Sequence, residues 1–189
     1  MTNASLGHFP AENTPISPAP EPRKNLERLI TAYDMFRKRA ENAPKLVLAG
    51  GKGWLYDAIF QRVTDLNLSD NVLFTQYIES EDINPLMCGA LAFVFPSVYE
   101  GFGMPPLEAM ACGVPVLTAD AASLPEVTGD CAVYCDPYAE DTIAEGLYTL
   151  YSRPELRADL SRRGLERAKT LTWDNSAELL YNVYKELVK

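Results

Sequence analysis

Two glutamates flank a turn rich in glycine and proline within the stretch FPSVYEGFGMPPLEAMACGVPV, residues 95–116. Glu100 precedes the glycines Gly101 and Gly103, and Glu108 follows a pair of prolines. Glycine lets a backbone turn sharply and approach a ligand closely, and proline suits the first turn of a helix. Because a helix N-terminus has unpaired N–H donors and a partial positive charge, we expect this turn to bind an anion such as a diphosphate.

The two carboxylates have a functional and a simpler interpretation. Inside the predicted helix, an ionised Glu108 can accept two hydrogen bonds from a vicinal diol such as that of ribose. Glu100 is expected at the end of a strand, facing the same cleft. Alternatively, Glu108 is a first-turn carboxylate that interacts with the helix dipole, and Glu100 is a solvated loop residue. Either glutamate alone leaves both interpretations open.

Short apolar runs alternate with helical patterns along the chain. The predicted strands are KLVLA (45–49), NVLFT (71–75), LAFVF (91–95), VPVLT (114–118) and AVY (132–134). Helices are predicted over 25–41, 55–66, 83–90, 106–112, near 124, and in three parts over 140–187. Doubly buried strands that alternate with helices indicate a Rossmann-like, doubly wound α/β sheet, here followed by a C-terminal helical segment. Ligands of such sheets bind beyond the carboxyl ends of strands, where the quoted stretch begins.

Composition and charge argue against several classes of protein. The formal net charge of -9 disfavours a nucleic-acid partner, because phosphate-backbone recognition needs a basic face. No apolar run approaches the roughly 18 residues of a transmembrane helix. The only histidine, His8, falls in the N-terminal tail, which argues against a Ser/His relay or a His-ligated zinc. The cysteines form no C-x-x-C pair and are interpreted as buried thiols of a cytoplasmic protein: Cys88, Cys112, Cys131 and Cys135.

The quoted stretch resembles the E-x7-E element of retaining glycosyltransferases of family 4, which have the two-domain GT-B architecture. Further stretches are similar to consecutive landmarks of that family's C-terminal, donor-binding domain. They are EPRKNLERLI (21–30), LVLAGGKGWLYDAIF (46–60), GALAFVFPSVYEGFGMPPLEAMACGVPVLTADAASLPEV (89–127) and the dipeptide DP at 136–137. The resemblance therefore implies one GT-B half, a nucleotide-sugar-binding domain over 21–189, preceded by a flexible or irregular arm over 1–20.

The resemblance also implies roles for charged residues. Glu100 is expected to contact hydroxyls of the transferred sugar, and Arg23 and Lys24 match the basic pair that neutralises the diphosphate. Departure of a nucleoside diphosphate builds negative charge on phosphate oxygens, which fixed cations in a dry cleft stabilise. Positive charge is slightly unfavourable at a helix start, so a purely structural role explains Arg23 and Lys24 poorly.

Donor binding is implied for a second group of residues. Glu108 is expected to hold the nucleotide ribose, and the loop near Ile78 to lie against the base. Backbone amides are expected to frame the sugar and the phosphates at Gly101, Phe102, Gly103 and Met104.

The implied reaction moves a sugar from a nucleotide-diphosphate sugar to an acceptor hydroxyl in surface polysaccharide or glycoconjugate synthesis. The family's usual mechanism has no protein nucleophile, since the departing phosphate draws the proton from the acceptor. A glycosidase-like acid and nucleophile pair is disfavoured because the turn belongs to another architecture. No D-x-D motif is present, so neither a metal nor another cofactor is expected. The stretch LVLAGGKGWLYD looks most like bacterial mannosyltransferases, which favours GDP-mannose over a UDP-sugar.

Family members carry the acceptor site on a separate N-terminal domain. Only some twenty residues precede EPRKN here. We therefore expect this chain alone to be inactive and to need an acceptor domain or partner subunit, through which any peripheral membrane contact would be made. The alternative is a catalytically silent nucleotide-binding or interaction module of the same fold. The family's opening strand is replaced by ENTPISPAP, whose prolines leave open whether residues 14–19 complete the sheet.

Overall fold

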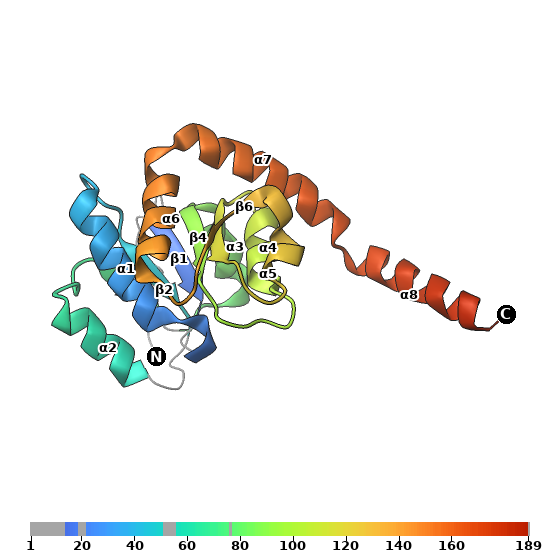
Figure 1. Ribbon diagram of the computed structural model, residues 1–189, viewed down its shortest axis with the longest axis horizontal. Helices are drawn as coiled ribbons and strands as arrows, with labels where there is room; N and C mark the ends of the chain where they lie inside the picture. The colour runs from blue at the N-terminus through green and yellow to red at the C-terminus, as the bar shows by residue number, and fades with distance from the viewer. Residues whose placement is uncertain (1–13, 19–21, 51–55, 76, 189) are drawn as a thin grey trace.

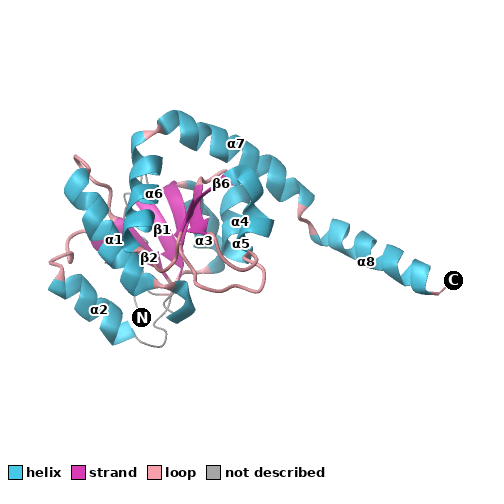
Figure 2. Ribbon diagram, viewed as in Figure 1, coloured by secondary structure: helices cyan, strands magenta, loops and turns pink. Residues whose placement is uncertain are grey.

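A six-stranded parallel sheet forms the centre of the molecule (Figures 1 and 2). The computed structural model describes residues 14–18, 22–50, 56–75 and 77–188. The strands are β1 (Thr14–Pro18), β2 (Leu46–Ala49), β3 (Val72–Phe74), β4 (Ala90–Phe95), β5 (Val116–Ala119) and β6 (Ala132–Cys135). They are ordered β3-β2-β1-β4-β5-β6, and every neighbouring pair is parallel. This doubly wound order confirms the predicted fold class.

Helices cover both faces of the sheet. The longer ones are α1 (Leu26–Arg39), α2 (Tyr56–Asp65), α3 (Ser80–Cys88), α4 (Met104–Ala111), α6 (Glu140–Ser152), α7 (Pro154–Thr170) and α8 (Trp173–Leu187). Shorter helices are η1 (Pro22–Lys24), α5 (Leu124–Thr128) and η2 (Gly129–Cys131). Helices α1, α2 and α6 pack on one face of the sheet, and α3, α4 and α5 pack on the other.

Strand β4 shows why its sequence has no polar side. Ala92 and Val94 belong to the core under α1, α2 and α6, whereas Phe93 and Phe95 belong to the core under α3, α4 and α5. Successive side chains of a strand point to opposite faces, so a strand covered on both faces is apolar throughout. Two hydrophobic cores therefore hold the strand that leads into the glycine turn.

Residues 14–18 form the central strand β1, so the expectation of an irregular arm over 1–20 is wrong for these five residues. β1 pairs with β2 from Ile16 to Pro18 and with β4 from Thr14 to Ile16. The register with β4 shifts between Thr14 and Pro15. Proline has no N–H to donate to a neighbouring strand. At a register shift, the regular hydrogen-bond position that would need this N–H is absent. Residues 1–13 and 19–20, including His8, lie outside the described residues.

The cysteines of the described chain are all free thiols. Cys131 and Cys135 are buried as predicted, and burial raises the pKa of Cys135 to about 12. Contrary to the prediction, Cys112 is only half-buried and Cys88 is exposed. Cys88 ends α3 next to Met87, which takes the buried position.

Helix α8 differs from the other long helices because none of its residues is buried. It extends away from the body of the molecule (Figure 1). Its exposed hydrophobic side chains include Trp173, Leu179, Leu180, Tyr181, Val183, Tyr184 and Leu187. Among the described helices, none has both the length and the apolar character needed to cross a membrane.

Gly146 allows α6 to pack closely against the sheet. A Cβ atom at Gly146 would lie 2.5 Å from Cδ1 of Leu117, which is fully buried in β5. Gly146→Ala gains about 1 kcal/mol of helix propensity, but overpacking a core costs about 1–3 kcal/mol. We expect a net loss of about 1 kcal/mol in the free energy of unfolding, measured by urea denaturation.

Gly164→Ala in α7 is the matched control. Its Cβ would lie 3.2 Å from Cγ and 3.3 Å from Cβ of Met110, a milder approach than the 2.5 Å at Gly146. The free energy of unfolding should therefore change less than for Gly146→Ala. Equal effects of the two substitutions would contradict the close packing of α6.

Candidate functional site

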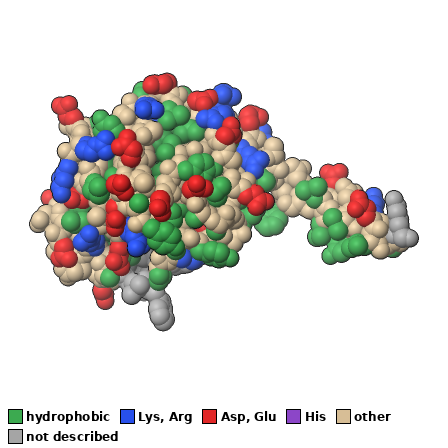
Figure 3. Space-filling model, in the orientation of Figure 1, with side chains coloured by type: hydrophobic (Ala, Val, Ile, Leu, Met, Phe, Trp, Pro, Cys, Tyr) green, Lys and Arg blue, Asp and Glu red, His purple; other side chains and the backbone are tan. Residues whose placement is uncertain are grey.

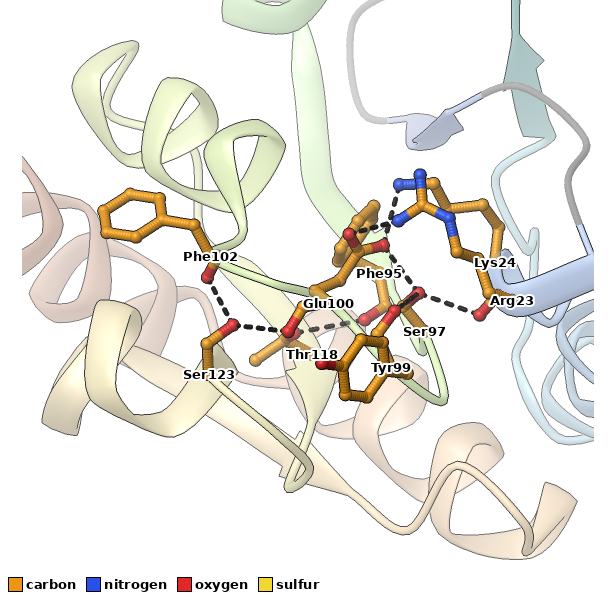
Figure 4. A network of polar contacts seen from close by, with 9 residues as sticks. All are labelled: Arg23, Lys24, Phe95, Ser97, Tyr99, Glu100, Phe102, Thr118 and Ser123. Carbon is orange, nitrogen blue, oxygen red and sulfur yellow. Dashed lines mark hydrogen bonds and ion pairs between the residues drawn. The ribbon is translucent and has the colours of Figure 1, made fainter.

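A charged cluster lies where β1 and β4 end. Arg23 and Lys24 lie in η1, after β1, and Glu100 follows β4. Lys24 Nζ donates a hydrogen bond to Glu100 Oε1 at 2.8 Å, and Arg23 Nη1 donates to Glu100 Oε2 (Figure 4). Because β1 and β4 are neighbours and parallel, their carboxyl ends meet at one edge of the sheet. The structure thus brings together the three charged residues that the sequence nominated.

The cluster has one accessible cation and one buried cation. The side chain of Arg23 is 44% exposed, whereas that of Lys24 is only 9% exposed. The Lys24 ammonium lies 4.4 Å from the centroid of the Phe95 ring, a favourable cation–π contact. Glu100 thus contacts two cations, of which Arg23 is the one that reaches solvent. An approaching anion would meet Arg23 first.

Glu100 remains ionised despite its burial. Its residue is 7% exposed, and this burial alone would raise the pKa of the carboxyl. Hydrogen bonds from Lys24 and Ser97, with the charges of Lys24 and Arg23, outweigh burial and lower the pKa below its ordinary value. The carboxylate is therefore a permanent counter-ion for the two cations at neutral pH.

Asn25 and Ser97 position the basic turn η1. Asn25 has a left-handed backbone, with φ 62°, and its Nδ2 donates to the carbonyls of Pro96 at 3.1 Å and Pro137 at 2.5 Å. Ser97 Oγ lies 2.8 Å from both the Arg23 carbonyl and Glu100 Oε1, and its single hydrogen serves one of them at a time.

Sequence reasoning missed both Asn25 and Ser97. Asn25 directly follows the basic pair, and asparagine tolerates left-handed backbone better than other non-glycine residues. That tolerance was a usable signal for Asn25. One partner of Ser97, Arg23, lies 74 positions away, and the other, Glu100, follows across a turn. Local sequence patterns could not identify either contact.

The glycine loop leads directly from Glu100 into α4. Gly103 has φ 109°, and a Cβ there would lie 2.9 Å from Cδ2 of Leu124, so only glycine fits without displacement. Helix α4 starts at Met104, two residues earlier than predicted. Its second and third residues are prolines, which have no N–H. The donors available to an anion therefore come from Met104 and from the loop before it.

Glu108 and Ile78 belong to other segments of the chain than the charged cluster. Glu108 is exposed and is the fifth residue of α4, one helical turn after Met104. Ile78 is half-buried and follows β3, which is three strands from β4. At about 4.8 Å between strands, that separation is about 14 Å. A ligand that contacts both Ile78 and the glycine loop must be extended along the carboxyl edge of the sheet.

An apolar pocket of about 260 Å³ adjoins the glycine loop. Its lining comes from the loop and α4 on one side and from the α7–α8 connection on the other: Phe102, Met104, Leu107, Leu171, Thr172, Trp173 and Ser176. Within the described ranges, no group of three or more His, Cys, Asp or Glu side chains is arranged to hold a metal ion.

Glu100→Gln removes the negative charge and leaves two cations without their counter-ion. We expect the free energy of unfolding at about pH 7 to fall by about 2 kcal/mol, the scale of hydrogen bonds to a charged group. Because the folded pKa of Glu100 is lowered, its contribution is present above the unfolded pKa and disappears as pH falls through the folded pKa. Denaturant titrations should show the gap between wild type and variant narrowing from about pH 7 towards pH 3.

Glu145→Gln is the control, because Glu145 forms an exposed ion pair with Arg39 at 2.8 Å. Exposed pairs contribute about 0–1 kcal/mol, so we expect little change at any pH. If the difference in unfolding free energy between wild type and Glu100→Gln did not change with pH, Glu100 would not be ionised with a lowered pKa.

Comparison with known proteins agrees with this fold. The family described as glycosyl transferases group 1 matches residues 16–167. The chain is 38% identical over 167 residues to O-antigen chain mannosyltransferase B of Escherichia coli. This match covers 88% of this chain and 44% of that protein. It is 31% identical over 171 residues to serotype-specific mannosyltransferase WbdA of Escherichia coli, covering 89% of this chain and 21% of that protein.

Among solved structures, sucrose-phosphate synthase from Thermosynechococcus elongatus matches with a TM-score of 0.82 at 26% identity, over 95% of this chain and 47% of that one. The chain thus spans less than half the length of each of these three proteins. Its fold is that of one half of a GT-B glycosyltransferase. Since the family match covers most of the sequence, the chain belongs to the glycosyl transferases group 1 family.

Proposed function

We propose that this chain is the C-terminal, donor-binding domain of a retaining glycosyltransferase of family 4. The enzyme transfers a hexose from a nucleoside-diphosphate sugar to an acceptor hydroxyl during surface polysaccharide or glycoconjugate synthesis. The observation that carries this proposal is the contact of Arg23 and Lys24 with Glu100, directly beside the glycine loop. This cluster lies between β1 and β4, where the strand order reverses and doubly wound folds bind their ligands.

The cations and the glycine loop both bind the diphosphate, through charge and through backbone amides respectively. Arg23, the exposed cation, contacts phosphate oxygens, while the buried Lys24 adds its charge at fixed position. These charges stabilise the nucleoside diphosphate as it departs, most strongly where water is excluded. Amides of Gly101, Phe102, Gly103 and Met104 frame the phosphates and the sugar. No metal or other cofactor is needed in this scheme.

The remaining nominated residues bind the sugar and the nucleoside. Glu100 has about four acceptor positions and gives up to three of them to Arg23, Lys24 and Ser97, so one stays available for a sugar hydroxyl. Glu108 is exposed on α4 and binds the ribose diol. Ile78 lies along the same edge of the sheet and contacts the base.

The donor that we favour is GDP-mannose, with a UDP-sugar as the second candidate. Two relatives that share 38% and 31% identity with this chain are named mannosyltransferases. The free thiols of the described residues agree with a cytoplasmic enzyme, where nucleotide sugars would be met.

An acceptor domain or partner subunit is proposed to cover α8 and the apolar pocket. Hydrophobic side chains gather along one side of α8 (Figure 3), and Trp173 is 81% exposed beside the pocket. A contiguous apolar surface of this kind marks a site of association. More than half of O-antigen chain mannosyltransferase B lies outside its match to this chain, which is ample length for such a domain.

Glu108→Ala tests donor binding. We expect calorimetric titration to show that wild type binds GDP or UDP and that the variant binds about 10–100-fold more weakly, since two hydrogen bonds from a charged acceptor are lost. Glu145→Ala, an exposed glutamate on α6, should bind like wild type. If wild type binds no nucleotide at all, the chain is a scaffold or interaction module and the proposed function is wrong.

Turnover tests the need for an acceptor domain. We expect the chain alone to transfer no sugar from GDP-mannose, and a protein that joins it to a candidate acceptor domain to do so. Transfer would be measured as the amount of GDP released, and the product would be identified by mass spectrometry. Full enzymatic rates from the isolated chain would show that no second domain is required.

A further inference from the structure

Ser123 contacts the glycine loop from the side opposite the cations. Its Oγ lies 2.9 Å from the carbonyl oxygen of Glu100 and 2.7 Å from that of Phe102. In Figure 4, Ser123 lies below the Phe102 carbonyl and to the left of the Glu100 carbonyl, and the charged ends of Arg23 and Lys24 are above and to the right. The single hydrogen of this hydroxyl is shared between two carbonyl groups of the same loop.

The Ser123 side chain is not used to cap the helix that it precedes. Serine directly before a helix usually accepts a hydrogen bond from that helix's own amides. Ser123 makes no such bond to α5, and its backbone is helical, with φ -78° and ψ -11°, rather than extended as in most caps. The hydroxyl is therefore committed to the loop and not to its local helix.

The geometry of the peptide bond extends this contact to the loop amides. In a trans peptide, the carbonyl of one residue and the N–H of the next point in opposite directions. No peptide bond of the described chain is cis. Because the carbonyls of Glu100 and Phe102 accept from Ser123, the N–H groups of Gly101 and Gly103 face away from Ser123.

Leu124 supports the same loop independently. Its Cδ2 lies where a Cβ of residue 103 would be, 2.9 Å from that position. Leu124 is fully buried, so this side chain cannot move away. Residues 123 and 124 thus fix the loop by one polar and one steric contact.

We infer that Ser123 is a positioning residue that aims the amides of Gly101 and Gly103 at the phosphates of the donor. This inference rests on the proposed function and adds a residue to it. Two N–H groups held in place bind an anion without first having to reorient, whereas an untethered glycine loop samples other backbone conformations. Loss of the hydroxyl should weaken phosphate binding rather than folding.

The test compares wild type with Ser123→Ala and Ser123→Thr. GDP affinity is measured by calorimetry, and the amide NMR signals of ¹⁵N-labelled glycines are followed during GDP titration. We expect Ser123→Ala to bind GDP about tenfold more weakly, with smaller shifts at Gly101 and Gly103. Ser123→Thr keeps the hydroxyl and should stay within about threefold of wild type.

Ser152→Ala is the matched control, because Ser152 Oγ also donates to a backbone carbonyl, that of Tyr148 at 2.7 Å, but far from the loop. It should bind GDP as wild type does. Unchanged GDP affinity in a folded Ser123→Ala would overturn the inference, as would wild-type Gly101 and Gly103 signals that GDP does not shift. The second outcome needs no variant to fold. Absence of GDP and UDP binding by wild type would instead refute the proposed function itself.

Discussion

The parallel pairing of β1 with β4 determines where Arg23, Lys24 and Glu100 lie. β1 delivers η1 and its two cations, and β4 delivers Glu100, so residues 76 positions apart in sequence come into contact. This pairing must tolerate Pro15 and Pro18, which have no N–H for a ladder. The register shift beside Pro15 shows how the sheet accommodates one of them while keeping the strand in its central place. The site therefore depends on an imperfect strand at the centre of the sheet.

The charged cluster is organised for position more than for stability. Burying an ion pair costs desolvation free energy that its attraction often only balances, so such a pair is weak evidence of a stabilising role. Here Lys24 is fixed by Glu100 and by the Phe95 ring, and Arg23 is left partly exposed. Neutral hydrogen bonds from Asn25 and Ser97 hold the basic turn without adding charge. The result is a site whose geometry exists before any anion arrives.

The sequence predicted the doubly wound sheet because its strands are apolar on both faces and alternate with amphipathic helices. β4 is the clearest case, since its alternate residues enter two different cores. The glycine turn was predictable because Gly103 needs a left-handed backbone that few other residues adopt. Local patterns failed where pairing is non-local: the segment that forms β1 was placed in an irregular arm, and its prolines left open whether it completes the sheet. Asn25, Ser97 and Ser123 were missed because their hydrogen bonds join segments distant in sequence.

The proline pair at the start of α4 restricts the backbone conformation both before folding and before a ligand binds. Proline restricts φ to values near -65°, so the chain at this point has few conformations even when unfolded. The first turn of α4 therefore loses little conformational entropy when the domain folds, and a ligand arriving at Met104 finds a backbone that is already rigid. The proline rings, and not only tertiary packing, therefore hold the backbone at this end of the cleft in one conformation after one ligand leaves and before the next one binds.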